Sequence, residues 1–98
     1  MNLTPSAALE CNRDDIRRIV LSHRAANPRV FGSVLHGDDT AESDFDLLVD
    51  PLPGATLLDL GGIQVELEAL LGVPVDVLTP GDLPTKFRDR VLQEAMAV

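Results

Sequence analysis

The sequence predicts a small α/β (α+β) domain in which helices flank a mixed β-sheet, with the element order αβ(α)βαβα. The length of 98 residues is that of one domain, which we expect to span residues 1–98. With 45% apolar and 24% charged residues, the composition is typical of a folded globular protein. Apolar residues at helical spacing alternate along the chain with short β-branched runs, which indicates strands connected through helices.

The first helix is expected over residues 13–26. Asn12 and Asp15, three residues apart, form an N-terminal capping pattern, and apolar residues then recur on one helical face. The dipeptide Asn27-Pro28 is expected to stop this helix, because the residue before a proline is disfavoured in the α region.

A short strand is expected next, over residues 29–31. Small and polar residues then predict a loop or a short helix start over residues 34–43. The run from Phe45 to Val49 is apolar and predicts a buried strand that follows Asp44.

The second half of the chain predicts a helix, a strand and a helix. Thr56 and Asp59 form a capping box for the middle helix, and Gly72 lies where a helix commonly ends in a glycine. The run over residues 74–78 predicts the third strand. Four apolar residues define one face of the last helix: Phe87, Val91, Leu92 and Ala95.

The net charge is acidic, with 16 Asp and Glu against 8 Lys and Arg. This balance disfavours direct nucleic-acid binding and binding to anionic membranes, because both depend on basic side chains. It favours metal cations or a basic protein as partners. A domain of this size buries a modest core, so we expect a homo- or hetero-oligomer.

The beginning of the sequence has no basic stretch followed by an apolar stretch, so we expect a soluble, cytoplasmic protein. The single Cys11 has no internal disulfide partner, which fits a reducing compartment. His23 lies on the apolar stripe of the first helix. We expect it to be a partly buried histidine with a hydrogen-bond partner rather than a metal ligand, since no second His or Cys stands at ligand spacing.

Three aspartates are the candidate site residues. Strand side chains alternate between faces, so Asp44 and Asp46 point the same way while Phe45 and its alternate neighbours point the other way. Asp76 interrupts the apolar third strand, and it joins this pair if the two strands are neighbours. Clustered carboxylates repel one another unless a cation lies between them, and hard oxygen ligands suit Mg²⁺. Taken alone, however, an Asp-x-Asp pattern is also typical of a solvated strand end or a turn.

The dipeptide Gly32-Ser33 makes the pattern more specific. It directly follows a predicted strand, where free backbone N–H groups and a hydroxyl can contact phosphate oxygens. Ten residues separate it from the Asp44-x-Asp46 pair.

The stretch GSVLHGDDTAESDFDLLVD, with the later VDVL strand, resembles the signature of the DNA polymerase β-like nucleotidyltransferases. The chain is most similar to their minimal MNT-type members, and the resemblance covers nearly its whole length. It implies that Gly32 and Ser33 hold the phosphates of a nucleoside triphosphate such as ATP. It also implies that Asp44 and Asp46 bind two Mg²⁺ ions, and that Asp76 completes the metal site and assists the attacking hydroxyl.

The chain departs from this family pattern at one position. The family usually has a basic residue, most often Arg, three positions after the serine, where this chain has His36. A neutral histidine binds a triphosphate less firmly than a permanently charged arginine. A second interpretation places His36 simply on the surface.

The resemblance implies a Mg-dependent nucleotidyltransferase that transfers AMP, or another nucleoside monophosphate, to a hydroxyl of a partner protein. Minimal members of the family commonly pair with a HEPN-domain toxin and act as its antitoxin. The alternative is a catalytically weak or inactive binding module that neutralises a toxin by masking its surface.

Overall fold

The computed structural model describes residues 4–40 and 42–98. Residues 1–3, at the start of the sequence, and residue 41, in the expected loop, lie outside the described part. The elements are α1 (Pro5–Ser22), β1 (Ala25–Phe31), α2 (Ser33–His36), β2 (Phe45–Pro51), α3 (Leu57–Leu71), β3 (Val75–Leu78), the 3₁₀ helix η1 (Pro80–Asp82), α4 (Thr85–Glu94) and β4 (Met96–Ala97).

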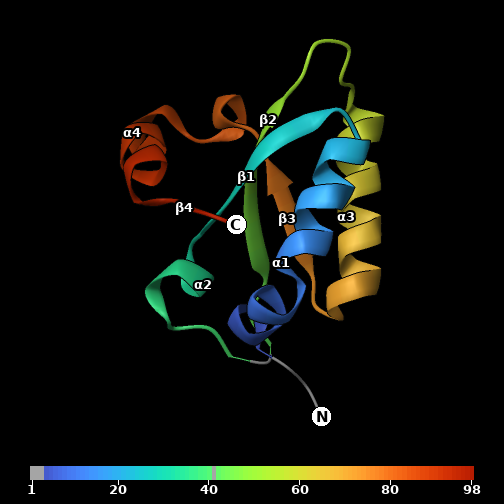
Figure 1. Ribbon diagram of the computed structural model, residues 1–98. Coiled ribbons are helices and arrows are strands. Elements are labelled where there is room, and N and C mark those ends of the chain that lie inside the picture. The colour runs from blue at the N-terminus through green and yellow to red at the C-terminus, as the bar shows by residue number, and fades with distance from the viewer. Residues whose placement is uncertain (1–3, 41) are drawn as a thin grey trace.

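The described strands form a mixed four-stranded sheet in the order β3-β2-β1-β4. Strands β2 and β3 are parallel, whereas β1 is antiparallel to both β2 and β4. Helices α1 and α3 lie side by side against one face of the sheet, while α2 and α4 lie on the other side of the molecule (Figure 1). The predicted α/β fold class with a small mixed sheet is therefore confirmed.

The core lies between the sheet and the helix pair α1 and α3. Alternate residues of β2, which are Phe45, Leu47 and Val49, are completely buried there. Helix α1 contributes Ile16 to the same cluster, and α3 contributes Leu67. This central strand therefore holds the two longest helices in place on one face of the sheet.

The opposite face of β2 is partly covered as well. Leu48, which points away from the main core, is completely buried, and Leu83, between η1 and α4, is only 4% exposed. Arg88 of α4 donates hydrogen bonds to the carbonyl oxygens of Gly81 and Leu83, which ties the helix to this connection. The segment η1–α4 thus removes part of the acidic face of β2 from water.

The predicted start of the first helix at residue 13 coincides with a break in α1, but α1 as a whole begins eight residues earlier, at Pro5. Thr4 is its N-cap, and its hydroxyl accepts a hydrogen bond from the Ala7 N–H (3.3 Å). Asn12 lies at a kink inside the helix with φ −133° and ψ 19°. Its side-chain amide donates to the Ala8 carbonyl (2.8 Å), so it bonds to the preceding turn instead of capping a new helix.

The predicted end of the first helix at residue 26 is also wrong, because α1 ends at Ser22 and β1 begins at Ala25. The dipeptide Asn27-Pro28 lies within β1, at an irregularity in its pairing with β2, where Asn27 has a positive φ of 53°. The side-chain amide of Asn27 donates to Asp50 of β2 (3.0 Å). The proline therefore lies at a bend within β1 and does not end a helix. The strand begins at Ala25, before the expected first residue 29.

Helix α3 begins and ends as the sequence predicts. Asp59 accepts a hydrogen bond from the Thr56 N–H (2.9 Å), and the helix ends at Gly72 in the left-handed conformation. A Cβ at Gly62 would lie 2.6 Å from the ring of His23, so this glycine makes room for the histidine. His23 pairs with Glu66 and is partly buried, which confirms the expectation of a partnered histidine.

The C-terminal region differs from the expectation in two respects. Helix α4 ends at Glu94, and β4 follows it as a short edge strand on β1, which the sequence analysis did not predict. Two residues are too few to show strand periodicity.

In the central sheet, β2 continues past the expected residue 49 to Pro51. No helix within the described residues is long and apolar enough to cross a membrane.

Candidate active site

The parallel pairing of β2 and β3 brings two of the predicted site residues together. Asp46 and Asp76 are direct register partners, so their side chains lie on the same face of adjacent strands. This face is opposite to the buried side chains Phe45 and Val75. Asp44 immediately precedes β2, two residues before Asp46, and its charge acts on the same carboxyl group.

The three carboxylates have different environments. Asp46 is half-buried, whereas Asp44 and Asp76 are exposed. Burial, followed by the negative charges of Asp76 and Asp44 and by hydrogen bonding to Asp76, raises the pKa of Asp46 to about 6. Each of these causes disfavours the ionised form. Asp46 is therefore the carboxylate that gains most from a nearby cation.

Gly32 lies directly against Asp46. The residue before it, Phe31, pairs with Asp46 across β1 and β2. Gly32 has φ 73° and ψ −144°, a conformation that L side chains rarely adopt, and a Cβ there would lie 2.4 Å from Asp46 Oδ2. Both the backbone conformation and the space therefore require glycine. Ser33 follows as the first residue of α2, directly after the glycine that lies against Asp46.

The structure also places α4 beside this site. A pocket of about 250 Å³ between α2 and α4 is lined by Gly32 and His36 and, from α4, by Phe87, Arg90 and Glu94. The sequence analysis assigned these α4 side chains no role in the site. They lie more than 50 residues from Gly32 along the chain, and no local motif indicated the contact.

The three carboxylates fit a hard divalent cation by their chemistry, since Mg²⁺ prefers carboxylate oxygens. Burial, and after it the negative charges of Asp76 and Asp44, raises the pKa of Asp46, and a bound cation would favour the ionised carboxylate again. Within residues 4–40 and 42–98, however, no three acidic, His or Cys side chains are arranged as a preformed ligand set. The donor set is therefore suitable, but it is not organised around an ion in this conformation.

Comparison with known proteins places this site in a family context. A protein of Methanocaldococcus jannaschii, described as a candidate protein adenylyltransferase, is 38% identical over 91 residues, covering 89% of this chain and 98% of the relative. The protein adenylyltransferase MntA of Thermococcus cleftensis is 38% identical over 69 residues, covering 70% of each chain.

Two solved structures share the fold. One, described as a minimal nucleotidyltransferase, has a TM-score of 0.85 and 39% identity, and the match covers 95% of each chain. The other, a toxin–antitoxin with AMP-PNP, has a TM-score of 0.73 at 18% identity and covers 88% of this chain and 71% of the other, which is a likeness of fold. The family model for the nucleotidyltransferase domain matches residues 13–98. The chain therefore belongs to the nucleotidyltransferase domain family, as its motif and fold predict.

Proposed function

We propose that this nucleotidyltransferase is Mg-dependent and transfers AMP, or another nucleoside monophosphate, from a nucleoside triphosphate to a hydroxyl of a partner protein. The observation that carries the proposal is the pairing of Asp46 with Asp76 directly beside Gly32. This arrangement puts the carboxylates that we propose as cation ligands next to the Gly32 backbone, which we propose binds phosphate.

Each residue has a proposed role. Asp44 and Asp46 would hold the Mg²⁺ that neutralises the triphosphate, and Asp76 would hold the Mg²⁺ that activates the attacking hydroxyl. The backbone at Gly32 and the hydroxyl of Ser33 bind phosphate oxygens. When bound, Mg²⁺ neutralises the triphosphate and lowers the pKa of the attacking hydroxyl.

In the proposed reaction, the partner's hydroxyl oxygen attacks the α-phosphorus. A new P–O bond forms to that oxygen, the bond to pyrophosphate breaks, and the hydroxyl proton is released. With a pKa of about 6, Asp46 is mostly ionised at neutral pH and so is available as a ligand. The net charge of −8 makes charge neutralisation important for a substrate that is itself an anion.

The nature of the partner is inferred from the relatives. Those from Methanocaldococcus and Thermococcus carry names that refer to protein adenylyltransferases. We infer that this chain is an antitoxin that modifies a HEPN-domain toxin in the cytoplasm. A gene for such a toxin beside the gene for this chain would support the pairing, and its absence would weaken it.

The central experiment is incubation with labelled ATP and Mg²⁺, with and without the neighbouring gene product. We expect label on the partner protein, and we expect Asp76→Asn to abolish it while much of the ATP affinity remains. Asp89→Asn, which changes an exposed aspartate of α4, is the matched control and should label normally. Ser33→Ala should weaken nucleotide binding by about 1.5–3 kcal/mol, the value of one hydrogen bond to a charged group. Wild-type protein that labels no partner would overturn the proposal.

The second candidate function is a binding module that masks a toxin surface. The presence of His36 in place of the usual arginine favours it, because a histidine, unlike an arginine, is not permanently charged and attracts phosphate less strongly. The same experiment separates the two functions. If Asp76→Asn still neutralises the toxin fully without transferring label, masking is the mechanism. If wild type is inactive and His36→Arg restores labelling, this position is the cause.

A further inference from the structure

The pocket between α2 and α4 adjoins the carboxylate cluster through a shared residue. Gly32 lines the pocket, and it also lies against the Asp46 carboxylate. Half of its lining residues are large and apolar: Phe31, Leu35, Phe87 and Val91. A molecule bound at Gly32 and Ser33 therefore has an apolar recess next to it.

Helix α4 presents an incompletely covered apolar face to this recess. Within the described part of the chain, no residue of α4 is buried, although the helix is amphipathic. Phe87 is 49% exposed, and its ring lines the pocket together with Val91. An exposed aromatic ring beside an apolar recess is suited to stacking against another planar ring.

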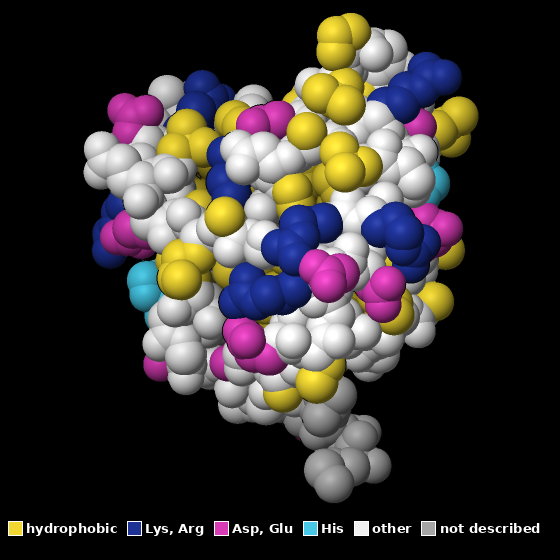
Figure 2. Space-filling view, in the orientation of Figure 1, with side chains coloured by type: hydrophobic (Ala, Val, Ile, Leu, Met, Phe, Trp, Pro, Cys, Tyr) yellow, Lys and Arg dark blue, Asp and Glu magenta, His cyan; other side chains and the backbone are white. Residues whose placement is uncertain are grey.

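Polar side chains line the same pocket, namely His36, Arg90 and Glu94. His36 of α2 lies 3.7 Å from the Glu94 carboxylate of α4, and Arg90 pairs with the same carboxylate at 3.2 Å. Figure 2 shows histidine, basic and acidic side chains close together on the side of the molecule where α2 and α4 lie. Donors and an acceptor beside apolar side chains match a heteroaromatic ring, which has apolar faces and polar edges.

We propose that this pocket binds the base of the nucleoside triphosphate, with Phe87 stacking on the ring, an inference that rests on the proposed function. The volume of about 250 Å³ lies just below the usual range for ligand pockets, about 300–1,000 Å³, and so suits one ring system rather than a whole nucleotide. The phosphates then extend out of the pocket to Gly32 and Ser33. Phe87 is thus a residue for base binding, and the carboxylates are left to the triphosphate.

The test compares ATP with inorganic triphosphate, which lacks the base. By calorimetry in the presence of Mg²⁺, Phe87→Ala should bind ATP roughly tenfold more weakly, the usual effect of losing one base–aromatic stack. Its affinity for inorganic triphosphate should not change. Gln93→Ala, an exposed change on the same helix, should leave both affinities unchanged. Circular dichroism confirms that each variant is folded.

A second variant reports on the pocket directly. The chain has no tryptophan or tyrosine, so Phe87→Trp introduces a unique fluorophore. ATP should change its emission, whereas inorganic triphosphate should not.

Three results would overturn the inference. The first is Phe87→Ala binding ATP as tightly as wild type, with no ATP-specific change in the tryptophan emission. The second is equal loss of ATP and triphosphate affinity in Phe87→Ala. In both cases the wild type still binds ATP and the proposed function stands. The third is wild-type protein that binds neither ligand, which overturns the proposed function together with this inference.

Discussion

The elevated pKa of Asp46 makes the stability of the metal-free protein depend on pH in a defined direction. The folded carboxyl titrates near pH 6 and the ordinary value is 3.8, so the folded state holds its proton more tightly than the unfolded state. The stabilisation is complete below about pH 3.8 and is lost as the pH rises through 6.

Asp46→Asn should remove this loss of folding stability at neutral pH, because an amide side chain does not ionise. In EDTA, we expect the variant to match wild type near pH 4 and to gain about 1 kcal/mol above pH 7, a value discounted because Asp46 is only half-buried. That is a rise in Tm of about 4–8 °C for a domain of this size. Asp50→Asn, which weakens an ion pair with Arg29, is the control and should lower the Tm at neutral pH. A stability difference between Asp46→Asn and wild type that is independent of pH would contradict the assignment.

Gly32 and Gly37 form a matched pair for testing the close approach to Asp46. Both have φ near 72°, but a Cβ at Gly37 meets nothing within 4 Å, whereas one at Gly32 would overlap Asp46. Gly37→Ala should cost about 1–2 kcal/mol from the left-handed conformation alone. Gly32→Ala should cost more in urea denaturation and should also abolish ATP binding. If the two variants lose equal stability and both bind ATP, the contact with Asp46 has no importance for the site.

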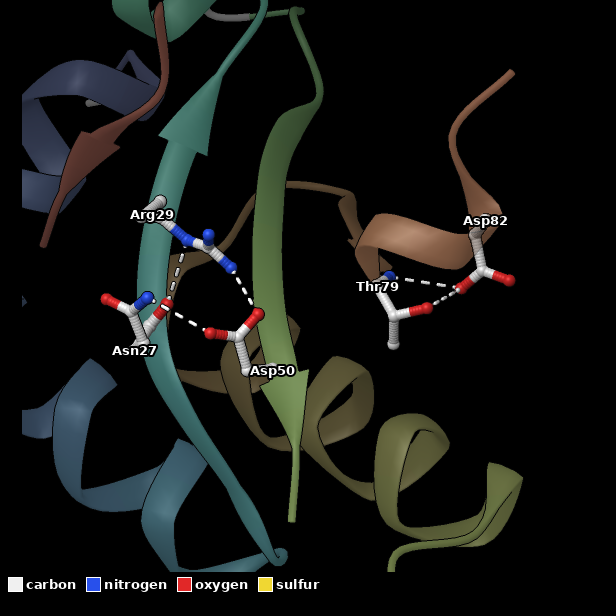
Figure 3. Close-up of polar contacts among 5 residues, drawn as sticks. All are labelled: Asn27, Arg29, Asp50, Thr79 and Asp82. Atoms are coloured by element: carbon white, nitrogen blue, oxygen red, sulfur yellow. Dashed lines mark hydrogen bonds and ion pairs between the residues drawn. The ribbon is translucent and has the colours of Figure 1, made fainter. Parts of the chain in front are cut away.

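At the scale of elements, β1 and β2 are joined by side chains as well as by their backbone pairing. Arg29 and Asn27 of β1 both donate to the Asp50 carboxylate of β2, at 2.7 and 3.0 Å (Figure 3). The Arg29 side chain is only 15% exposed, so removal of its partner leaves a largely buried charge. These bonds hold the irregular part of β1 that contains the proline.

Asp50→Ala should therefore destabilise the fold by about 1–3 kcal/mol, the usual effect of leaving a buried polar group without its partner. Asp82→Ala is the comparison, because Asp82 accepts hydrogen bonds from Thr79 at an exposed turn, also drawn in Figure 3. We expect it to cost about 1 kcal/mol, as for the loss of a helix cap. Urea denaturation measures both. If Asp50→Ala costs no more than Asp82→Ala, the backbone pairing alone holds β1 to β2.

At the scale of the whole molecule, the acidic charge of −8 predicts a response to divalent cations. A cation that binds the folded state stabilises it by mass action, so Mg²⁺ or Mn²⁺ should raise the Tm. The double variant Asp44→Asn with Asp46→Asn should remove most of that rise. NaCl at equal ionic strength is the control, because it screens the general repulsion without binding at the carboxylates. An unchanged response in the double variant places the cation elsewhere.

Elements with local sequence signals could be predicted from the sequence alone. The capping box at Thr56, the end of α3 at Gly72 and the alternation around Phe45 each depend on neighbouring residues, and the structure contains all three. The family resemblance likewise depended on one continuous stretch that begins at Gly32. By contrast, the helical turns before Asn12 and the proline inside β1 were not predicted, and at the proline the pairing of β1 with β2 overrode the usual local preference.

Which distant residues share the site depends on the tertiary structure. The alternation in each strand indicated the face of Asp46 and of Asp76, but only the parallel register of β2 with β3 made them direct partners. The position of α4 beside Gly32 could not be predicted from the sequence either. Phe87 lies on the apolar face of an amphipathic helix, and that pattern is the same whichever part of the molecule the helix packs against. Local patterns specify the conformation of a segment, whereas contacts between segments depend on how the whole chain buries its apolar surface.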